Sequence, residues 1–381
     1  MESISKKVEP VRIGLIGAGF MGRCHAHAFR SVSGLFDIEI PIELYSLADV
    51  DQISANKNAK ALGFERATSD WRELISDELI DIIAITTPNI FHEEMALAAI
   101  AAGKTVYCEK PLATNLEAAK RMVKAASDKK VVTVVGFNFL RNPLIAYAKK
   151  LIESGELGDL VSFRGRHAEY YMPKDVPHSF RTEINGGGAL ADIGSHIVAM
   201  ARYLVGDIST VCTQSKTIHK LRSCKKSGND ESVQNKESFV DDVSHSLIEF
   251  SSGLQGSIDV SWIMSGRNMD LEFEVTGTEG AIIFNQERMN ELLLWKNTEA
   301  KPENGFRKIE MGPAHPPYGN FCPAPGHQIG FNDLKIIEVA ELINCHNTNQ
   351  PHECDFFEAY QIMKVVDAMQ QSVKLKSWVS V

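Results

Sequence analysis

The chain has 381 residues, of which 44% are hydrophobic and 23% are charged. This length exceeds what one ordinary hydrophobic core organises, so two domains are expected. The formal charge of −9, without any run rich in Lys and Arg, argues against a nucleic-acid partner.

The first third of the chain alternates short apolar runs with segments of helical periodicity. This alternation predicts a doubly wound parallel sheet of α/β class over residues 1–137, connected by short right-handed crossovers. Gly103 is expected to end one of the helices in a left-handed conformation. Strands are expected at residues 11–16, 42–48, 81–85, 105–108 and 131–136, and helices at about 21–32, 70–75, 92–102 and 114–127.

From residue 138 onward, strand-like segments dominate, and they predict an α+β domain over residues 138–381. Its sheet is expected to be large, open and mostly antiparallel. Helices are expected at residues 144–154, 190–205 and 355–374, and the last of these can pack back on the first domain. The polar segment 221–236 is expected to be an excursion between two strands. Strands are expected at residues 160–168, 209–216, 243–250, 253–262, 271–276 and 281–284.

The N-terminal segment and the cysteines favour a cytoplasmic protein. Residues 1–10 are polar, and no segment approaches the roughly 18 apolar residues that a membrane span needs. The cysteines are dispersed without a CxxC pair, which is typical of free thiols in a reducing compartment, and no metal site is expected. They are Cys24, Cys108, Cys212, Cys224, Cys322, Cys345 and Cys354.

The sequence Gly17-Ala18-Gly19-Phe20-Met21-Gly22 follows a predicted strand and opens a predicted helix. In this context the GxGxxG pattern predicts dinucleotide binding. Gly17 would make the tight turn, Gly19 would let the backbone approach a pyrophosphate, and Gly22 would let helix and strand pack closely. The helix N-terminus would then face the phosphates.

Asp49 ends the second predicted strand, where a carboxylate can accept hydrogen bonds from the ribose hydroxyls. The same carboxylate would repel a 2′-phosphate, and no arginine follows it. NAD is therefore favoured over NADP. Asp51 is the alternative for this role.

Several motifs together resemble the glucose–fructose oxidoreductase / inositol dehydrogenase / MocA (Gfo/Idh/MocA) family, and the resemblance covers nearly the whole chain. The motifs are the glycine-rich sequence, Thr86-Thr87-Pro88-Asn89 with His92, Glu109-Lys110-Pro111, Gly136-Phe137-Asn138, Asp192-Ile193-Gly194-Ser195-His196 and the stretch 326–333.

This resemblance implies an oxidoreductase with a Rossmann domain and a second domain built on an open sheet. It implies that Lys110, Asp192 and His196 form the catalytic group, and that a cis peptide bond precedes Pro111. It also implies a homodimer or homotetramer that pairs through the C-terminal sheet. The cofactor contacts expected from the glycine motif and the resemblance are Gly17, Gly19, Phe20, Met21, Gly22, Asp49, Thr87, Pro88, Asn89, His92, Glu109 and Lys110.

The three residue types suit the oxidation of an alcohol. A histidine such as His196 titrates near neutral pH and can take the hydroxyl proton. The Lys110 ammonium can stabilise a developing alkoxide. Asp192 lies four residues before His196, one helical turn away, where it can orient the imidazole or stabilise its protonated form.

The substrate contacts are the least determined part of the site. Lys110, Asp192 and His196 are expected to touch the substrate, together with Asn138, Tyr170 and Arg181. Packing or surface roles stay open for the last three, and likewise for Arg141, Arg166 and Tyr171. Glu109 is expected to contact the cofactor or brace Lys110, whereas His25, His27 and Trp262 are interpreted as structural.

The expected function is an NAD-dependent dehydrogenase that oxidises a secondary alcohol or hemiacetal of a sugar, anhydrosugar or cyclitol. The resemblance supplies this substrate class, because the residues alone support only hydride transfer between an alcohol and a carbonyl. Two alternatives stay open. One is a glycosidase that uses NAD through a transient ketone, and the other is a non-catalytic regulator that senses a dinucleotide.

Overall fold

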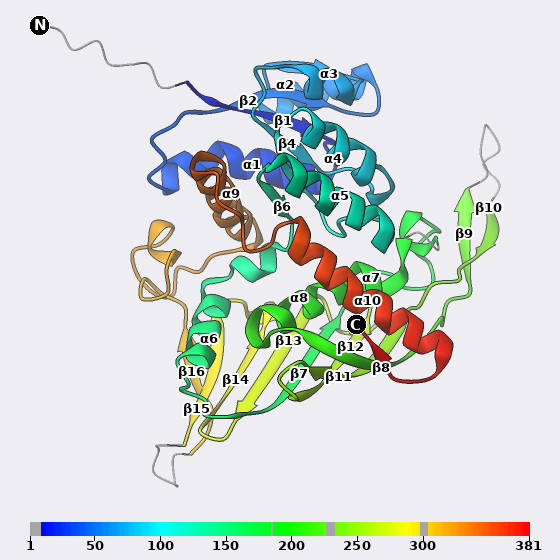
Figure 1. Ribbon diagram of the computed structural model, residues 1–381, viewed down its shortest axis with the longest axis vertical. Coiled ribbons are helices and arrows are strands. Elements are labelled where there is room, and N and C mark those ends of the chain that lie inside the picture. The colour runs from blue at the N-terminus through cyan, green and yellow to red at the C-terminus, as the bar shows by residue number, and fades with distance from the viewer. Residues whose placement is uncertain (1–8, 184–185, 226–232, 298–303) are drawn as a thin grey trace, which may run out of the picture. The chain divides into compact units, whose positions relative to one another are not determined.

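A computed structural model describes residues 9–183, 186–225, 233–297 and 304–381 (Figure 1). The chain divides into two compact units. The first comprises the chain up to Ala113, Glu117–Asn138 and Ile329–Ala359, and the second comprises Thr114–Leu116, Phe139–Gln328 and Tyr360–Val381. The first unit thus includes residues 329–359, which the sequence analysis placed in the second domain. The reason is that helix α9 (Phe331–Thr348) packs against α1 (Phe20–Leu35).

The first unit contains a six-stranded parallel sheet in the order β3-β2-β1-β4-β5-β6, which confirms the predicted doubly wound sheet. Its central strand β4 is buried along its whole length, as a parallel sheet covered on both faces requires. The strands are β1 (Val11–Ile16), β2 (Ile42–Ala48), β3 (Arg66–Thr68), β4 (Ile82–Ile85), β5 (Thr105–Cys108) and β6 (Thr133–Val135).

Helices surround this sheet, and Figure 1 shows α1 and α9 beside each other. Asp51 caps α2 by accepting a hydrogen bond from the Ser54 backbone N–H. Gly103 follows α4 with a φ of 74°, the predicted left-handed conformation. Besides α1 and α9, the helices are α2 (Gln52–Leu62), α3 (Trp71–Ser76), α4 (His92–Ala101) and α5 (Leu116–Lys129).

The second unit contains a nine-stranded sheet in the order β16-β15-β14-β13-β7-β12-β11-β8-β17. Strands β7 and β12 pair in parallel, and the other neighbouring strands pair antiparallel, which confirms the predicted fold class. The strands are β7 (Leu160–Ala168), β8 (Ile208–Lys216), β11 (Val243–Phe250), β12 (Gln255–Ser261), β13 (Asp270–Gly277), β14 (Gly280–Asn285), β15 (Glu291–Lys296), β16 (Arg307–Glu310) and β17 (Val379–Ser380).

Helix α8 (Gly194–Val205) packs on β7, β12 and β13, and α6 (Pro143–Glu153) packs on α8. Asn142 caps α6 by accepting a hydrogen bond from the Leu144 N–H, and Pro143 occupies the first helical turn. Helix α10 (Phe356–Leu375) begins in the first unit and continues in the second. Among the residues that the structure describes, no helix is long and apolar enough to cross a membrane.

One expectation for the second unit is wrong, and the excursion expected between two strands proves to contain strands of its own. The single helix expected at residues 190–205 is two helices, α7 (Gly188–Asp192) and α8, separated at Ile193. The segment 221–236 contains an antiparallel pair, β9 (Leu221–Lys225) and β10 (Val233–Glu237), because cross-strand pairing satisfies the backbone of these polar residues. Residues 226–232 lie outside the described part of the chain.

Candidate active site

The glycine-rich turn between β1 and α1 has the geometry that a dinucleotide needs. Gly17 has a φ of 93°, in the left-handed region that favours glycine. A Cβ at Gly22 would lie 2.1 Å from the Gly17 carbonyl oxygen, so only glycine fits there. At Gly19, by contrast, no described atom apart from its chain neighbours lies within 4 Å of the Cβ position. A bound group can therefore approach the backbone of Gly19 closely. Among the described residues, no side chain caps α1, and its first N–H groups can bind a phosphate.

Phe20, the first residue of α1, is 64% exposed beside this turn, and its ring stacks on Phe331. Asp49 follows β2 and is half-buried. Its carboxylate accepts hydrogen bonds from the Val50 N–H (2.8 Å) and from Asn58 Nδ2 (2.7 Å). Asp51 is committed to capping α2. Asp49 is therefore the acid held at the end of β2, and its contact with the ribose stays a prediction.

The loop after β4 is braced by His92. Thr86 Oγ1 donates to the Gly17 carbonyl oxygen (2.6 Å), which ties this loop to the glycine turn. Both ring nitrogens of the buried His92 face carbonyl oxygens, those of Thr87 and Pro111, each at 2.9 Å. Burial lowers the pKa of His92, although these two hydrogen bonds oppose that effect. His92 therefore bridges the loops after β4 and β5, and its expected contact with the cofactor stays a prediction.

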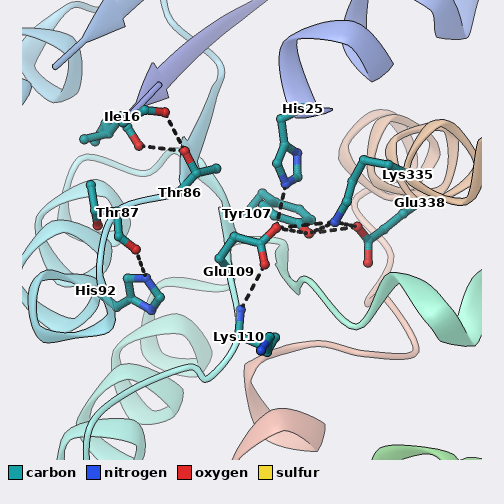
Figure 2. A network of polar contacts seen from close by, with 11 residues as sticks. Ile16, His25, Thr86, Thr87, His92, Tyr107, Glu109, Lys110, Lys335 and Glu338 are labelled. Atoms are coloured by element: carbon teal, nitrogen blue, oxygen red, sulfur yellow. Dashed lines mark hydrogen bonds and ion pairs between the residues drawn. The ribbon is translucent and has the colours of Figure 1, made fainter. Parts of the chain in front are cut away.

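Glu109 ends β5 and lies in a buried network of polar side chains (Figure 2). Its Oε1 accepts hydrogen bonds from His25 Nε2 (2.9 Å) and from Lys335 Nζ (3.4 Å). Its Oε2 accepts from the backbone N–H of Lys110 (3.3 Å). The sequence predicted that Glu109 contacts the cofactor or braces Lys110. The hydrogen bond with the Lys110 N–H is a direct contact of the second kind. His25, interpreted from the sequence as structural, is a member of this network.

The charges of the network are set by burial and by Lys335. Burial alone would raise the pKa of Glu109, but Lys335 and the hydrogen bond from His25 outweigh it and hold that pKa well below the ordinary value. Burial lowers the pKa of His25, and the charge of Lys335 lowers it further. The imidazole is therefore neutral and donates through Nε2. The carboxylate is therefore ionised behind Lys110, and the Lys110–Pro111 peptide bond is cis, as the resemblance implied.

In the second unit, Asp192 ends α7, and among the described residues two side chains donate hydrogen bonds to it. Tyr171 Oη donates to Asp192 Oδ2 at 2.6 Å, and Arg181 Nε donates to the same oxygen at 3.1 Å. Burial and the Asp192 charge raise the pKa of Tyr171, so its hydroxyl stays protonated and keeps donating. These contacts orient the carboxylate.

The helix is interrupted at Ile193, between Asp192 and His196. Contrary to the prediction from the sequence, the two residues therefore do not lie on one continuous turn of helix. His167 Nδ1 donates to the Ile193 carbonyl oxygen (2.7 Å), and the His196 N–H donates to the same oxygen (3.1 Å). The i to i−3 spacing of the latter bond marks the break. His167 Nε2 also contacts Glu169 Oε1 at 2.8 Å, and the His167 and His196 rings lie 5.6 Å apart. A buried His–Glu pair thus supports the backbone that separates the two residues.

The other residues proposed for the substrate differ in their surroundings. Tyr170 is 49% exposed and forms an isolated bridge with Ile263, whereas Asn138 is buried. Arg166 forms ion pairs with Asp270 and Glu272 across the sheet, which gives it a structural role there. Arg141 is buried, and Trp262 is a buried residue that donates to Asp242, in line with its structural interpretation.

Sequence reasoning missed Tyr107, His167, Glu169, Lys335 and Glu338. The last two had a detectable signal, because charged residues three apart interrupt the apolar run from Leu334 to Val339. A lysine and a glutamate at that spacing within an otherwise apolar run indicate a buried ion pair. In the structure, Lys335 Nζ and Glu338 Oε2 lie 2.6 Å apart.

Comparison with known families covers both units. Residues 11–137 match the family described as "Oxidoreductase family, NAD-binding Rossmann fold". Residues 145–283 match the "GFO/IDH/MocA C-terminal domain". The two matches fall on the six-stranded and the nine-stranded sheets respectively.

Named relatives match this chain over 71% to 98% of its length. Levoglucosan dehydrogenase of Pseudarthrobacter phenanthrenivorans is 37% identical, with 98% of this chain and 99% of that protein covered. The NAD(+)-dependent scyllo-inositol 2-dehydrogenase of Bacillus subtilis is 30% identical over 71% of this chain and 73% of its own length. A solved structure of levoglucosan dehydrogenase in complex with NADH and levoglucosan superimposes with a TM-score of 0.93, at 37% identity over 98% of this chain and 99% of that one. The chain therefore belongs to the Gfo/Idh/MocA family of NAD-dependent oxidoreductases.

Proposed function

We propose that this protein is an NAD-dependent dehydrogenase that oxidises a ring secondary alcohol or hemiacetal of an anhydrosugar, sugar or cyclitol. The observation that carries this proposal is the similarity to levoglucosan dehydrogenase along the whole chain, at 37% identity. The inositol dehydrogenases among the relatives support the broader class of polyhydroxylated rings. We favour an anhydrosugar because the anhydrosugar enzyme matches over a larger share of this chain than the inositol enzymes do.

The cofactor would be held by the first unit. The open Gly19, the uncapped N-terminus of α1 and the carboxylate of Asp49 fit the pyrophosphate and ribose of NAD. The remaining contacts proposed for it are those named in the sequence analysis. When bound, NAD⁺ accepts a hydride from the carbon that is oxidised. Asp49 would disfavour NADP because its charge repels a 2′-phosphate.

Three side chains are proposed to act on the substrate hydroxyl. His196 would take the hydroxyl proton while the C–H bond breaks and a carbonyl forms. The Lys110 ammonium would donate to the same oxygen and stabilise the negative charge that develops on it. Asp192, oriented by hydrogen bonds from Tyr171 and Arg181, would orient His196 or stabilise its protonated form. Asn138, Tyr170 and Arg181 are proposed to contact the other hydroxyl groups of the ring.

The proposal is tested by mixing the purified protein with NAD⁺ and a panel of anhydrosugars, sugars and inositols while the reduced cofactor is measured. We expect one ring class to give reduced cofactor with NAD⁺ and much less with NADP⁺. Absence of reduced cofactor with every compound, in a protein that binds NAD, would refute the dehydrogenase assignment.

The residue roles are tested by Lys110→Ala and His196→Ala. Each substitution is expected to lower kcat by a factor of about 100 or more, because each removes a group that acts in the transition state. The Kd for NAD⁺ should change little. Full activity of the Lys110→Ala protein would refute the assignment of Lys110.

A further inference from the structure

Lys335 is a buried cation on α9 that reaches the end of β5. Its side chain has no exposed surface, and its ammonium donates to Tyr107 Oη (2.8 Å), Glu338 Oε2 (2.6 Å) and Glu109 Oε1 (3.4 Å). Figure 2 shows this ammonium between the two carboxylates, with the Lys110 backbone on the far side of Glu109. All of these residues belong to the first unit.

A buried carboxylate stays ionised only where a positive charge or several donors compensate its loss of water. The titratable and charged groups around Glu109 are Cys24 and His25 from α1, Tyr107, Cys108 and Lys110 from β5 and its end, His92 from α4, and Lys335 and Glu338 from α9. Glu338 adds a second negative charge, and His25 is neutral. Among the described residues, Lys335 is therefore the charged side chain whose hydrogen bond compensates Glu109.

The ionised Glu109 has a second contact that leads to the proposed site. Its Oε1 accepts hydrogen bonds from His25 and Lys335, which hold the carboxylate in place. Its Oε2 accepts a hydrogen bond from the backbone N–H of Lys110. A carboxylate fixed in this way sets where the backbone of Lys110 lies. A proton on Glu109 would weaken the group as an acceptor and loosen that contact.

We propose that Lys335 is a positioning residue for Lys110: it keeps Glu109 ionised and oriented, so that the carboxylate holds the backbone from which the Lys110 side chain extends. The importance of this for catalysis rests on the proposed function, in which the Lys110 ammonium meets the substrate oxygen. The α9 helix, distant in sequence from Glu109-Lys110-Pro111, thereby helps to support that motif.

The test compares wild type with Lys335→Met, Glu109→Gln and the double variant Glu109→Gln/Lys335→Met. Hydrogen exchange at the Lys110 amide is measured in the protein without cofactor or substrate. In parallel, kcat and the KM for NAD⁺ are measured against pH. The matched control is Lys104→Met, which removes another buried ammonium of the same unit. Lys104 precedes β5 and bonds to the carbonyl oxygens of Asp77 (2.7 Å) and Ile80 (2.6 Å).

In Lys335→Met, the Lys110 amide is expected to exchange at least about tenfold faster, and kcat to fall at least about tenfold at neutral pH, as expected for losing a hydrogen bond to a charged group. Without Lys335, burial is opposed more weakly, by His25 and Lys110, so the pKa of Glu109 rises. The loss of kcat should therefore ease as pH rises and Glu109 ionises again. Lys104→Met should leave both the amide exchange and the shape of the pH profile as in wild type.

The double variant removes both charges, so it also covers the case in which Lys335→Met alone does not fold. It should match Glu109→Gln in amide exchange and in kcat, because Lys335 acts through Glu109. Wild-type exchange at the Lys110 amide in Lys335→Met would overturn the proposal. So would a further fall in kcat when Lys335→Met is added to Glu109→Gln, if that fall is as large as the one Lys335→Met causes in the wild type. Faster exchange in a protein that has no dehydrogenase activity would support the positioning role and reject the proposed function.

Discussion

Replacing Tyr171 by phenylalanine removes one of the two donors to Asp192 that the described structure shows, and it keeps the ring of the side chain. The hydroxyl donates to Asp192 Oδ2 at 2.6 Å, a hydrogen bond to a charged acceptor. Such bonds contribute about 1.5–3 kcal/mol. Because Arg181 still donates to the same oxygen, we expect a loss of about 1–2 kcal/mol, or about 5- to 30-fold in kcat/KM.

The assay is kcat/KM for the active ring compound with NAD⁺, and the matched control is Tyr170→Phe. Tyr170 is adjacent in sequence but half-exposed, with no hydrogen bond to Asp192 in the described structure. The sequence alone favoured Tyr170 over Tyr171 as a substrate contact, so the two variants separate the two interpretations. A larger loss in Tyr170→Phe than in Tyr171→Phe would refute the reasoning that Tyr171 orients Asp192.

Two further predictions concern the cofactor. Gly22→Ala should raise the Kd for NADH at least about tenfold, as measured by fluorescence titration. The reason is that the new Cβ would lie 2.1 Å from the Gly17 carbonyl oxygen and must displace the turn. Wild-type affinity for NADH would contradict the role of this turn. Asp49→Ala should narrow the ratio of kcat/KM for NAD⁺ over NADP⁺, because it removes the charge that repels a 2′-phosphate. An unchanged ratio would place the ribose contact elsewhere.

The architecture was predictable because both units follow simple periodicities. The strands 11–16, 42–48, 105–108, 160–168 and 243–250 were expected with the bounds that the structure has. In the first unit, apolar runs between turn residues mark them. Helix α9 was missed because it is buried on most sides, so its apolar residues do not follow one stripe. The pair β9 and β10 was missed because its strands are polar.

The candidate site was predictable only where one motif fixes the geometry. The glycine turn and the cis bond before Pro111 fall into this class. The break at Ile193 was not predictable, because it depends on His167, a residue of β7 whose bond to the Ile193 carbonyl no local pattern reveals. Lys335 likewise reaches Glu109 only through the packing of α9 on α1. The pairing of subunits through the C-terminal sheet stays a prediction.

The central claim, net oxidation of a ring alcohol by NAD⁺, is tested most directly by stoichiometry. The protein is incubated with NAD⁺ and an anhydrosugar that carries deuterium at its ring carbinol carbons, and the reduced cofactor and the sugar product are both measured. We predict one deuterium-labelled NADH for each ketone formed, with the anhydro bridge of the sugar intact. Cleavage of the sugar without net NADH would instead show a glycosidase, and binding without any turnover would show a regulator.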